Sequence, residues 1–205
     1  MTWIEISIAA GVFLTIRNAL ARTLSGKVSP VLISWARFAF NLPLSGPLVF
    51  FFSLSSGWPT LSLQFYWYCF LTGVAQIFAN VALVSAFQNT SFAQAIVLHK
   101  LEVVFTALFG VAFFAEIPSD LGWVGIILSS LGVMLMNFGE KGGPDGLGHA
   151  FHLDVGALLA LACAVFLVLA SFMLKEATAE FAAITPHFGA SRFEAGVHAV
   201  FHTTW

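Results

Sequence analysis

Charged residues and cysteines are scarce in this chain. Asp, Glu, Lys and Arg make up 9% of its 205 residues, against about 25% in a soluble domain, so a soluble globular fold is excluded. The formal net charge is -2, and no basic excess indicates a nucleic-acid partner. Cys69 and Cys163 both lie in apolar stretches. We interpret them as small buried side chains and not as a disulfide pair.

Motifs of several enzyme and metal-site classes are also missing. The sequence has no glycine-rich phosphate loop, so ATP hydrolysis is unsupported, and no Ser/His or His-Glu-x-x-His arrangement typical of a protease. Residues 149–154 contain His and Asp but stand alone in a predicted loop, so we expect no metal site and no cofactor. We expect a protein that is not an enzyme. An intramembrane enzyme that uses His99 and Glu102 is a weaker alternative.

Long apolar runs dominate the sequence instead. Hydrophobic residues make up 59% of it, and a bilayer core of about 30 Å needs roughly 20 apolar residues per helix. Barrel strands would show alternating runs of about 10 residues, whereas these runs are continuously apolar. The sequence therefore predicts an all-α fold, a polytopic transmembrane helical bundle. Its six predicted spans are 3–21, 31–53, 65–87, 92–114, 121–139 and 155–174.

A Gly-rich, charged segment and an internal similarity suggest two units. Ala9–Arg22 aligns with Ala162–Lys175, with identical Ala, Val, Phe and Leu residues and a basic residue at the end of each. A repeat of five helices has an odd number of membrane spans. A second copy would therefore insert in the membrane in the opposite orientation, and such inverted repeats are typical of transporters. We predict a first repeat over 1–140, a linker over 141–154 and an incomplete second repeat over 155–205. The tail after about residue 180 shows no clear period, and we expect a truncated or frame-shifted end there.

The fourth predicted span contains the largest group of ionisable residues. His99 and Glu102 share a helical face with Thr106, whereas Lys100 points away from them. An ionisable residue in a membrane helix is costly and suggests a functional site. Glu102 is therefore a candidate for substrate or proton binding. The alternative is a structural ion pair with Lys100 on a neighbouring helix, or with Arg37.

Polar residues in the first three spans are further candidates. Arg17 lies near the end of its span, so it either serves a site or extends to the membrane surface. Arg37 lies near the start of the second span, where anchoring at the interface is the alternative. Gln76 and Asn80 share a face of the third span. They would either contact a substrate or form hydrogen bonds between helices.

Asn41 lies just before two prolines in the second span. Pro43 and Pro47 each remove a backbone hydrogen bond, which bends or breaks a helix. Broken helices near the middle of the membrane often line transporter sites. A kink that serves only packing is the alternative.

Several segments resemble one transporter family. The fourth span is similar to the fourth-helix signature of EamA-type transporters of the drug/metabolite transporter superfamily, in Ala93–Leu98, Leu101–Gly110 and Phe113–Glu116. Trp35–Phe38 resembles the second-helix motif of that family, and Leu121–Ile126 with Leu131–Val133 resembles the fifth. The resemblance implies ten helices in two inverted repeats, with Glu102 and nearby polar groups close to a central cavity. Four helices of the second repeat would then be missing from this chain.

These observations lead to one main functional hypothesis. We expect a secondary transporter of small metabolites or amphipathic solutes, an exporter working by alternating access in the bacterial inner (plasma) membrane. Its partners would be the lipid bilayer, a small-molecule substrate, and either a second copy of the chain or the missing helices. A non-transporting fragment or a structural membrane subunit is the alternative. The candidate cavity residues are Arg17, Arg37, Asn41, Gln76, Asn80, His99, Lys100 and Glu102.

Overall fold

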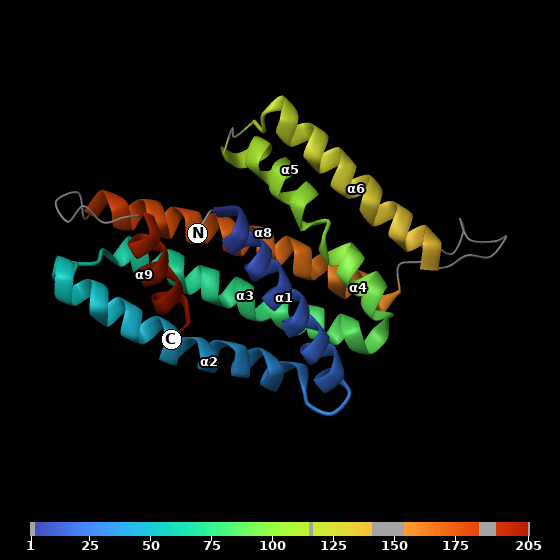
Figure 1. Ribbon diagram of the computed structural model, residues 1–205, viewed down its shortest axis with the longest axis horizontal. Helices are drawn as coiled ribbons and strands as arrows, with labels where there is room; N and C mark the ends of the chain where they lie inside the picture. Colours follow the sequence, from blue (N-terminus) through green and yellow to red (C-terminus); the bar gives the residue numbers. More distant parts are fainter. Residues whose placement is uncertain (1–2, 115–116, 141–153, 185–191, 205) are drawn as a thin grey trace.

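The protein is built from helices joined by short loops (Figure 1). The computed structural model describes residues 3–114, 117–140, 154–184 and 192–204, and these residues include no β-strand. This confirms the predicted all-α bundle. The helices are α1 (Trp3–Ser25), α2 (Pro30–Ser56), α3 (Leu63–Asn89), α4 (Phe92–His99), α5 (Glu102–Phe114), α6 (Asp120–Glu140), α8 (Val155–Ile184) and α9 (Arg192–Thr204).

Four stretches of the described chain are long and apolar enough to cross a membrane. They are Pro30–Leu54, Leu63–Asn89, Phe92–Phe113 and Val155–Ile184, and they correspond to four of the six predicted spans. The predicted spans 3–21 and 121–139 form α1 and α6. Neither is among those four, and the apolar stretch described in α6 is the shorter Asp120–Gly132.

Side-chain caps define where the helices begin. The hydroxyl oxygens of Ser29, Ser62 and Ser91 accept hydrogen bonds from backbone N–H groups three residues on, at 3.3, 3.1 and 3.1 Å. Ser119 caps α6 in the same way at 3.2 Å, and the carboxylate of Asp154 caps α8 at 2.6 Å. Each cap satisfies one of the N–H groups that a helix start leaves without a partner. Short loops can therefore join long helices without loss of backbone hydrogen bonds.

The fourth span is broken, whereas the proline-containing second span is not. Between α4 and α5, Lys100 and Leu101 form a turn, and the Leu101 N–H donates to the Leu98 carbonyl three residues back at 3.1 Å. This tighter hydrogen bonding is typical of a functional hinge or a strained sequence. The α2 helix runs unbroken through Pro43 and Pro47. A broken helix at the prolines, one of the two predicted alternatives, is therefore absent from α2, and the break at residues 100–101 lies within a predicted continuous span.

The core is formed by α3 and α8, which make the most extensive contact in the molecule and lie side by side (Figure 1). Small residues permit this close packing, because Ala79 and Ala86 of α3 and Ala160 of α8 are almost fully buried in one cluster. Gly156 lies against the cap of α3, where an added Cβ would be 2.6 Å from the Cβ of Thr90. The α4 helix packs on this pair.

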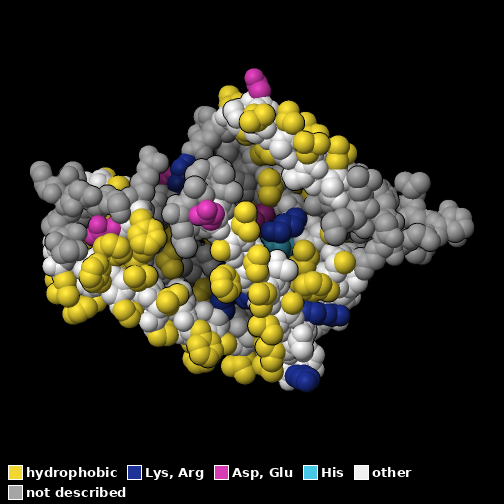
Figure 2. Space-filling view, viewed as in Figure 1, with side chains coloured by type: hydrophobic (Ala, Val, Ile, Leu, Met, Phe, Trp, Pro, Cys, Tyr) yellow, Lys and Arg dark blue, Asp and Glu magenta, His cyan; other side chains and the backbone are white. Residues whose placement is uncertain are grey.

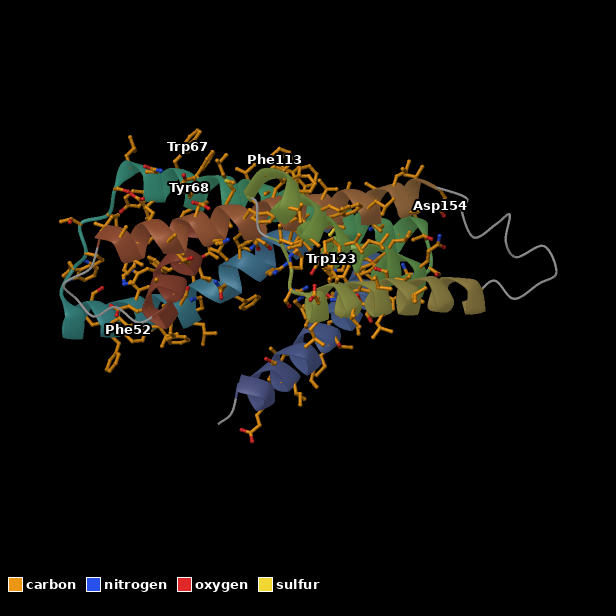
Figure 3. All side chains as sticks on the ribbon, turned by 90° about the horizontal axis from the view of Figure 1, so that it is seen from above. Phe52, Trp67, Tyr68, Phe113, Trp123 and Asp154 are labelled. Carbon is orange, nitrogen blue, oxygen red and sulfur yellow. The ribbon has the colours of Figure 1, made fainter. Side chains whose placement is uncertain are left out.

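The outer surface is mostly hydrophobic, as expected for a protein surrounded by lipid. Figure 2 shows hydrophobic side chains spread over the described part of one face, with separate charged groups between them. Trp67 and Phe113 point away from the bundle (Figure 3) and are 59% and 73% exposed. Such a surface would be an aggregation hazard in water, but it is the normal condition in a bilayer.

Part of the tail differs from the sequence-based expectation. We expected no bundle helix after about residue 180, but α8 continues to Ile184 and residues 192–204 form α9, which packs on α2, α3 and α8. The apolar pattern is hard to detect because the buried residues of α9 are Glu194, Ala195, His198 and Ala199. The predicted linker, the His residues at 149 and 152, and residues 185–191 lie outside the described residues.

Candidate functional site

A cavity of about 460 Å³ lies between α1, α2 and α3, and it contains three of the candidate residues. Arg17 comes from α1, Arg37 from α2 and Asn80 from α3. Asn18 and Ser34 are the other polar residues in its lining, and the rest are apolar. We call this space the arginine cavity. Its volume suits a small-molecule ligand.

Hydrogen bonds hold the polar groups of the arginine cavity in place. The side-chain N–H2 of Asn80 donates to the Gln76 carbonyl one turn back at 2.7 Å, which leaves its oxygen free to accept from Arg37. That second bond crosses from α2 to α3, so Asn80 forms the interhelical hydrogen bond that was one of its two predicted alternatives. Arg17 donates from Nε and Nη2 to the side-chain oxygen of Asn18, at 3.3 and 2.9 Å.

The charges of the arginine cavity are not balanced by acidic groups. No Asp or Glu is among its described lining residues, and within the described chain neither Arg17 nor Arg37 forms an ion pair with a carboxylate. Both guanidinium groups belong to the lining of the same cavity. Each guanidinium has five N–H donors, and the bonds above use two on Arg17 and one on Arg37. The arrangement therefore offers positive charge and free donors to an anion.

A second, smaller cavity of about 260 Å³ lies on the other side of Arg37. Arg37 shares its lining with Asn41 and Gln76, and α8 and α9 supply the opposite wall. We call it the amide cavity, because the side-chain amides of Asn41 and Gln76 form no hydrogen bond to any described residue. Each such amide can both donate and accept. Arg37 thus lies between two cavities.

The break between α4 and α5 brings a third group of side chains together. His99 is 5% exposed, and its Nε2 lies 3.6 Å from Oε2 of Glu102. Its Nδ1 lies 3.5 Å from the Sγ of Cys163 on α8. The predicted shared face of His99 and Glu102 is therefore present, although the helix is interrupted between them. The buried Oε2 of Glu102 has no hydrogen-bond partner in the described chain.

The remaining candidate stands apart from these groups. Lys100 is exposed, and it is not among the lining residues of either cavity. The structure thus gathers Arg17, Arg37 and Asn80 in one cavity and Asn41 and Gln76 with Arg37 in the next. It pairs His99 with Glu102 at the helix break.

Sequence reasoning missed three contributors to these groups. Asn18 holds Arg17, Cys163 contacts His99, and Thr203 of α9 lines the amide cavity. Asn18 was detectable as the amide next to an intramembrane arginine. Cys163 and Thr203 carried no signal, because their positions depend on how α8 and α9 pack on the other helices.

Comparison with known proteins gives a family match over most of the chain. The family model described as EamA-like transporter family matches residues 1–138. No curated protein matches the chain, and no solved structure does.

Proposed function

The chain belongs to the EamA-like transporter family, and we propose that it is a secondary carrier for a small solute with an anionic group. Family membership makes it a multi-pass integral membrane protein and a membrane transporter of the drug/metabolite type, from a family of transporters and not of enzymes. The solute class, the alternating-access mechanism and the outward direction of transport are our proposals. The same holds for its location in the bacterial inner (plasma) membrane.

One observation carries the choice of an anionic solute. Arg17 and Arg37 lie in a single cavity that has no described acidic residue. Two positive charges in a mostly apolar space are costly unless an anion accompanies them. Arginine also binds carboxylate and phosphate groups with two parallel hydrogen bonds. The apolar remainder of the lining suits the hydrocarbon part of an amphipathic solute.

Glu102 supplies a group for coupling to protons. Its Oε2 lies next to His99 at the helix break and accepts no hydrogen bond from any described residue. Chains of Glu and His within membrane segments are typical of proton relays. We propose that Glu102 takes up and releases one proton per transport cycle and that His99 positions it.

The carrier cycle needs walls on both sides of the solute. The described chain surrounds the arginine cavity with α1, α2 and α3 of the first predicted repeat. We propose that a second copy of the chain, or further helices of the second repeat, supplies the wall on the other side of the solute. Inverted repeats that rock against each other around a central site are the general basis of alternating access.

The test is to measure the uptake of radiolabelled solutes by proteoliposomes that contain the purified chain. Uptake is measured instead of current because a carboxylate that moves together with one proton carries no net charge. The solutes are sets of similar shape in which one group is a carboxylate, a neutral amide or an amine. We expect the carboxylates to be taken up, and we expect Arg17→Gln to remove this uptake. Arg22→Gln is the matched control, because Arg22 lies five residues further along α1 and is absent from the cavity lining. A folded chain with no uptake of any set would favour the structural-subunit alternative.

A further inference from the structure

A third cavity continues the row that begins with the arginine cavity. It has a volume of about 410 Å³ and lies between α2 and α9. Asn41 and Val200 belong both to its lining and to that of the amide cavity. Arg37 in turn is shared by the amide cavity and the arginine cavity. The three spaces therefore follow one another along α2, and we call the third one the apolar groove.

Hydrocarbon surface dominates the apolar groove. No charged residue is among its described lining residues, and Asn41 and Ser45 are the polar ones. The Ser45 hydroxyl already donates to the Asn41 carbonyl at 2.9 Å. Leu44 and Phe193 line the groove and are 70% and 64% exposed, so the groove is open toward the surrounding lipid. Such a space suits an alkyl chain and offers no partner to a second ion.

One face of α2 carries the groups that connect these spaces. The positions concerned are four, three and four residues apart, which places them on the same helical face. They are Arg37, Asn41, Leu44 and Leu48. A helix rises about 1.5 Å per residue, so this face runs about 16 Å in all and about 10 Å from Asn41 to Leu48. It presents a positive charge, then an amide, then an apolar strip.

The wall formed by α9 repeats this order. Thr203 and Thr204 line the amide cavity, whereas Gly196 and Val197, earlier in the helix, line the apolar groove. Val200 lies at the junction of the two spaces. Because α9 belongs to a buried core cluster with α3 and α8, this wall is a fixed part of the structure. Both walls thus change from polar to apolar at the same level.

The order of these groups defines a solute with three parts. The guanidinium of Arg37 binds a carboxylate. The side-chain amides of Asn41 and Gln76 can each donate and accept, so together they match an amide linkage, which also has one donor and one acceptor. The apolar groove beyond them suits a hydrocarbon chain, and the apolar part of the arginine cavity lies on the other side of Arg37.

We propose that the solute is an N-acylated apolar amino acid. Its carboxylate binds Arg37, its amide linkage binds Asn41 and Gln76, and its acyl chain lies in the apolar groove. The amino-acid side chain occupies the arginine cavity. This inference rests on the proposed function, which places an anionic group at Arg37, and it adds the nature of the groups attached to that anion.

The test uses a series of N-acylleucines, from acetyl to octanoyl, and the purified protein in nanodiscs. An extended octanoyl chain is close in length to the apolar groove. Equilibrium dialysis gives each dissociation constant relative to the free compound in water, after subtraction of binding to empty nanodiscs. We expect the affinity to rise about fourfold for each methylene group that is buried. Equal affinity for acetylleucine and octanoylleucine would overturn the assignment of the groove.

A leucine at Gly196 reduces the space in the apolar groove. An added Cβ at Gly196 meets no atom within 4 Å. Gly125→Leu is the matched control, because a Cβ at Gly125 of α6 also meets no atom and the residue lines none of the three cavities. We expect the preference for octanoylleucine over acetylleucine to be at least about tenfold smaller in Gly196→Leu than in Gly125→Leu, the contribution of about two methylene groups.

A smaller substitution covers a failure of Gly196→Leu to fold. Gly196→Val, compared with Gly125→Val, should reduce the same preference at least about fourfold. An equal preference in the two variants of either pair would overturn the proposal. So would a phospholipid that native mass spectrometry finds on the unaltered protein but not on Gly196→Leu, and that octanoylleucine does not displace, because the groove would then belong to the bilayer.

Two further compounds separate the parts of the proposal. The ester analogue of octanoylleucine lacks the amide N–H, so it should bind about fivefold more weakly for the loss of one hydrogen bond. Equal binding of ester and amide would contradict the role of Asn41 and Gln76. The carboxamide of acetylleucine lacks both the charge and the long chain. If it bound as tightly as acetylleucine, the proposed function itself would be refuted, whatever the acyl series showed.

Discussion

Gly156 is the position where the structure predicts the largest effect of one added methyl group. A Cβ there would lie 2.6 Å from the Cβ of Thr90 and 3.0 Å from the backbone carbon of Asn89. Carbon atoms pack at about 3.5–4.0 Å, so the start of α8 must move by about 1 Å in Gly156→Ala. Forced overpacking of this kind costs about 1–3 kcal/mol. We therefore expect the free energy of unfolding to fall by about 2 kcal/mol.

The assay is reversible unfolding of the purified protein in mixed micelles, followed by circular dichroism. Gly125→Ala is the matched control, because a Cβ at Gly125 meets no atom within 4 Å. That variant should be neutral or more stable by up to about 1 kcal/mol, since Ala favours helix over Gly. If Gly156→Ala were as stable as Gly125→Ala, the close approach of α8 to the turn before α4 would be wrong. The contact between Cys163 and His99, which depends on the same packing of α8 against α4, would then also be wrong.

Three further predictions concern the candidate site and α9. Asn80→Ala should lower the free energy of unfolding by about 2 kcal/mol, because the partly buried guanidinium of Arg37 loses its charged hydrogen bond. Unfolding in micelles measures this, and an unchanged free energy would contradict the interhelical bond. In the unaltered protein, a pH gradient should drive an accumulation of solute of about tenfold per pH unit if one proton is coupled. Glu102→Gln should abolish this accumulation and leave solute counterflow intact. Loss of both activities, or of neither, would contradict proton coupling. Burial lowers the pKa of His198, and burial followed by the neighbouring His198 lowers the pKa of His202 to about 4. The packing of α9 on the bundle therefore has its full stability above about pH 6.5 and loses stability as the pH falls toward 4. The reason is that both imidazoles bind protons when α9 is separated from the bundle but not when α9 is packed on it. Hydrogen exchange of α9 relative to α8, corrected for intrinsic rates, should rise between pH 7.5 and pH 5, and a constant ratio would exclude this linkage.

The helices were predictable because lipid imposes a simple rule on the sequence. A continuous apolar run long enough to cross a bilayer can satisfy its backbone hydrogen bonds in lipid only as a helix. The predicted spans 31–53 and 65–87 accordingly lie within α2 and α3. The observed helices are longer at each end because capped turns continue into the interface. Ser29 and Ser62 provide the caps. Hydropathy does not detect these polar turns.

The break at residues 100–101 was not predictable from local signals. The segment contains neither Pro nor Gly, and it reads as one helix from 92 to 114. The turn depends on tertiary packing, since α4 and α5 both contact α8 but run at different angles to it (Figure 1). For α2, by contrast, the prolines led us to expect a bend or a break in the helix. A membrane helix tolerates them when nearby groups satisfy the freed backbone, and α2 stays continuous.

The candidate site was predictable in its residue types but not in its grouping. An arginine or a carboxylate inside an apolar span is conspicuous in any sequence, and this found Arg17, Arg37 and Glu102. Which of them share a cavity depends on helix rotation and crossing. The contact of Cys163 with His99 and the wall formed by Thr203 therefore required the structure.

The central claim is that Arg17 and Arg37 bind an anionic group. The most direct measurement is the ratio of dissociation constants for a carboxylate solute and its isosteric amide, titrated into the purified protein. A hydrogen bond to a charged group contributes about 1.5–3 kcal/mol, so we expect the carboxylate to bind about 10–150-fold more tightly. Arg37→Gln should bring that ratio close to one. Equal affinity of the carboxylate and the amide for the unaltered protein would contradict the account.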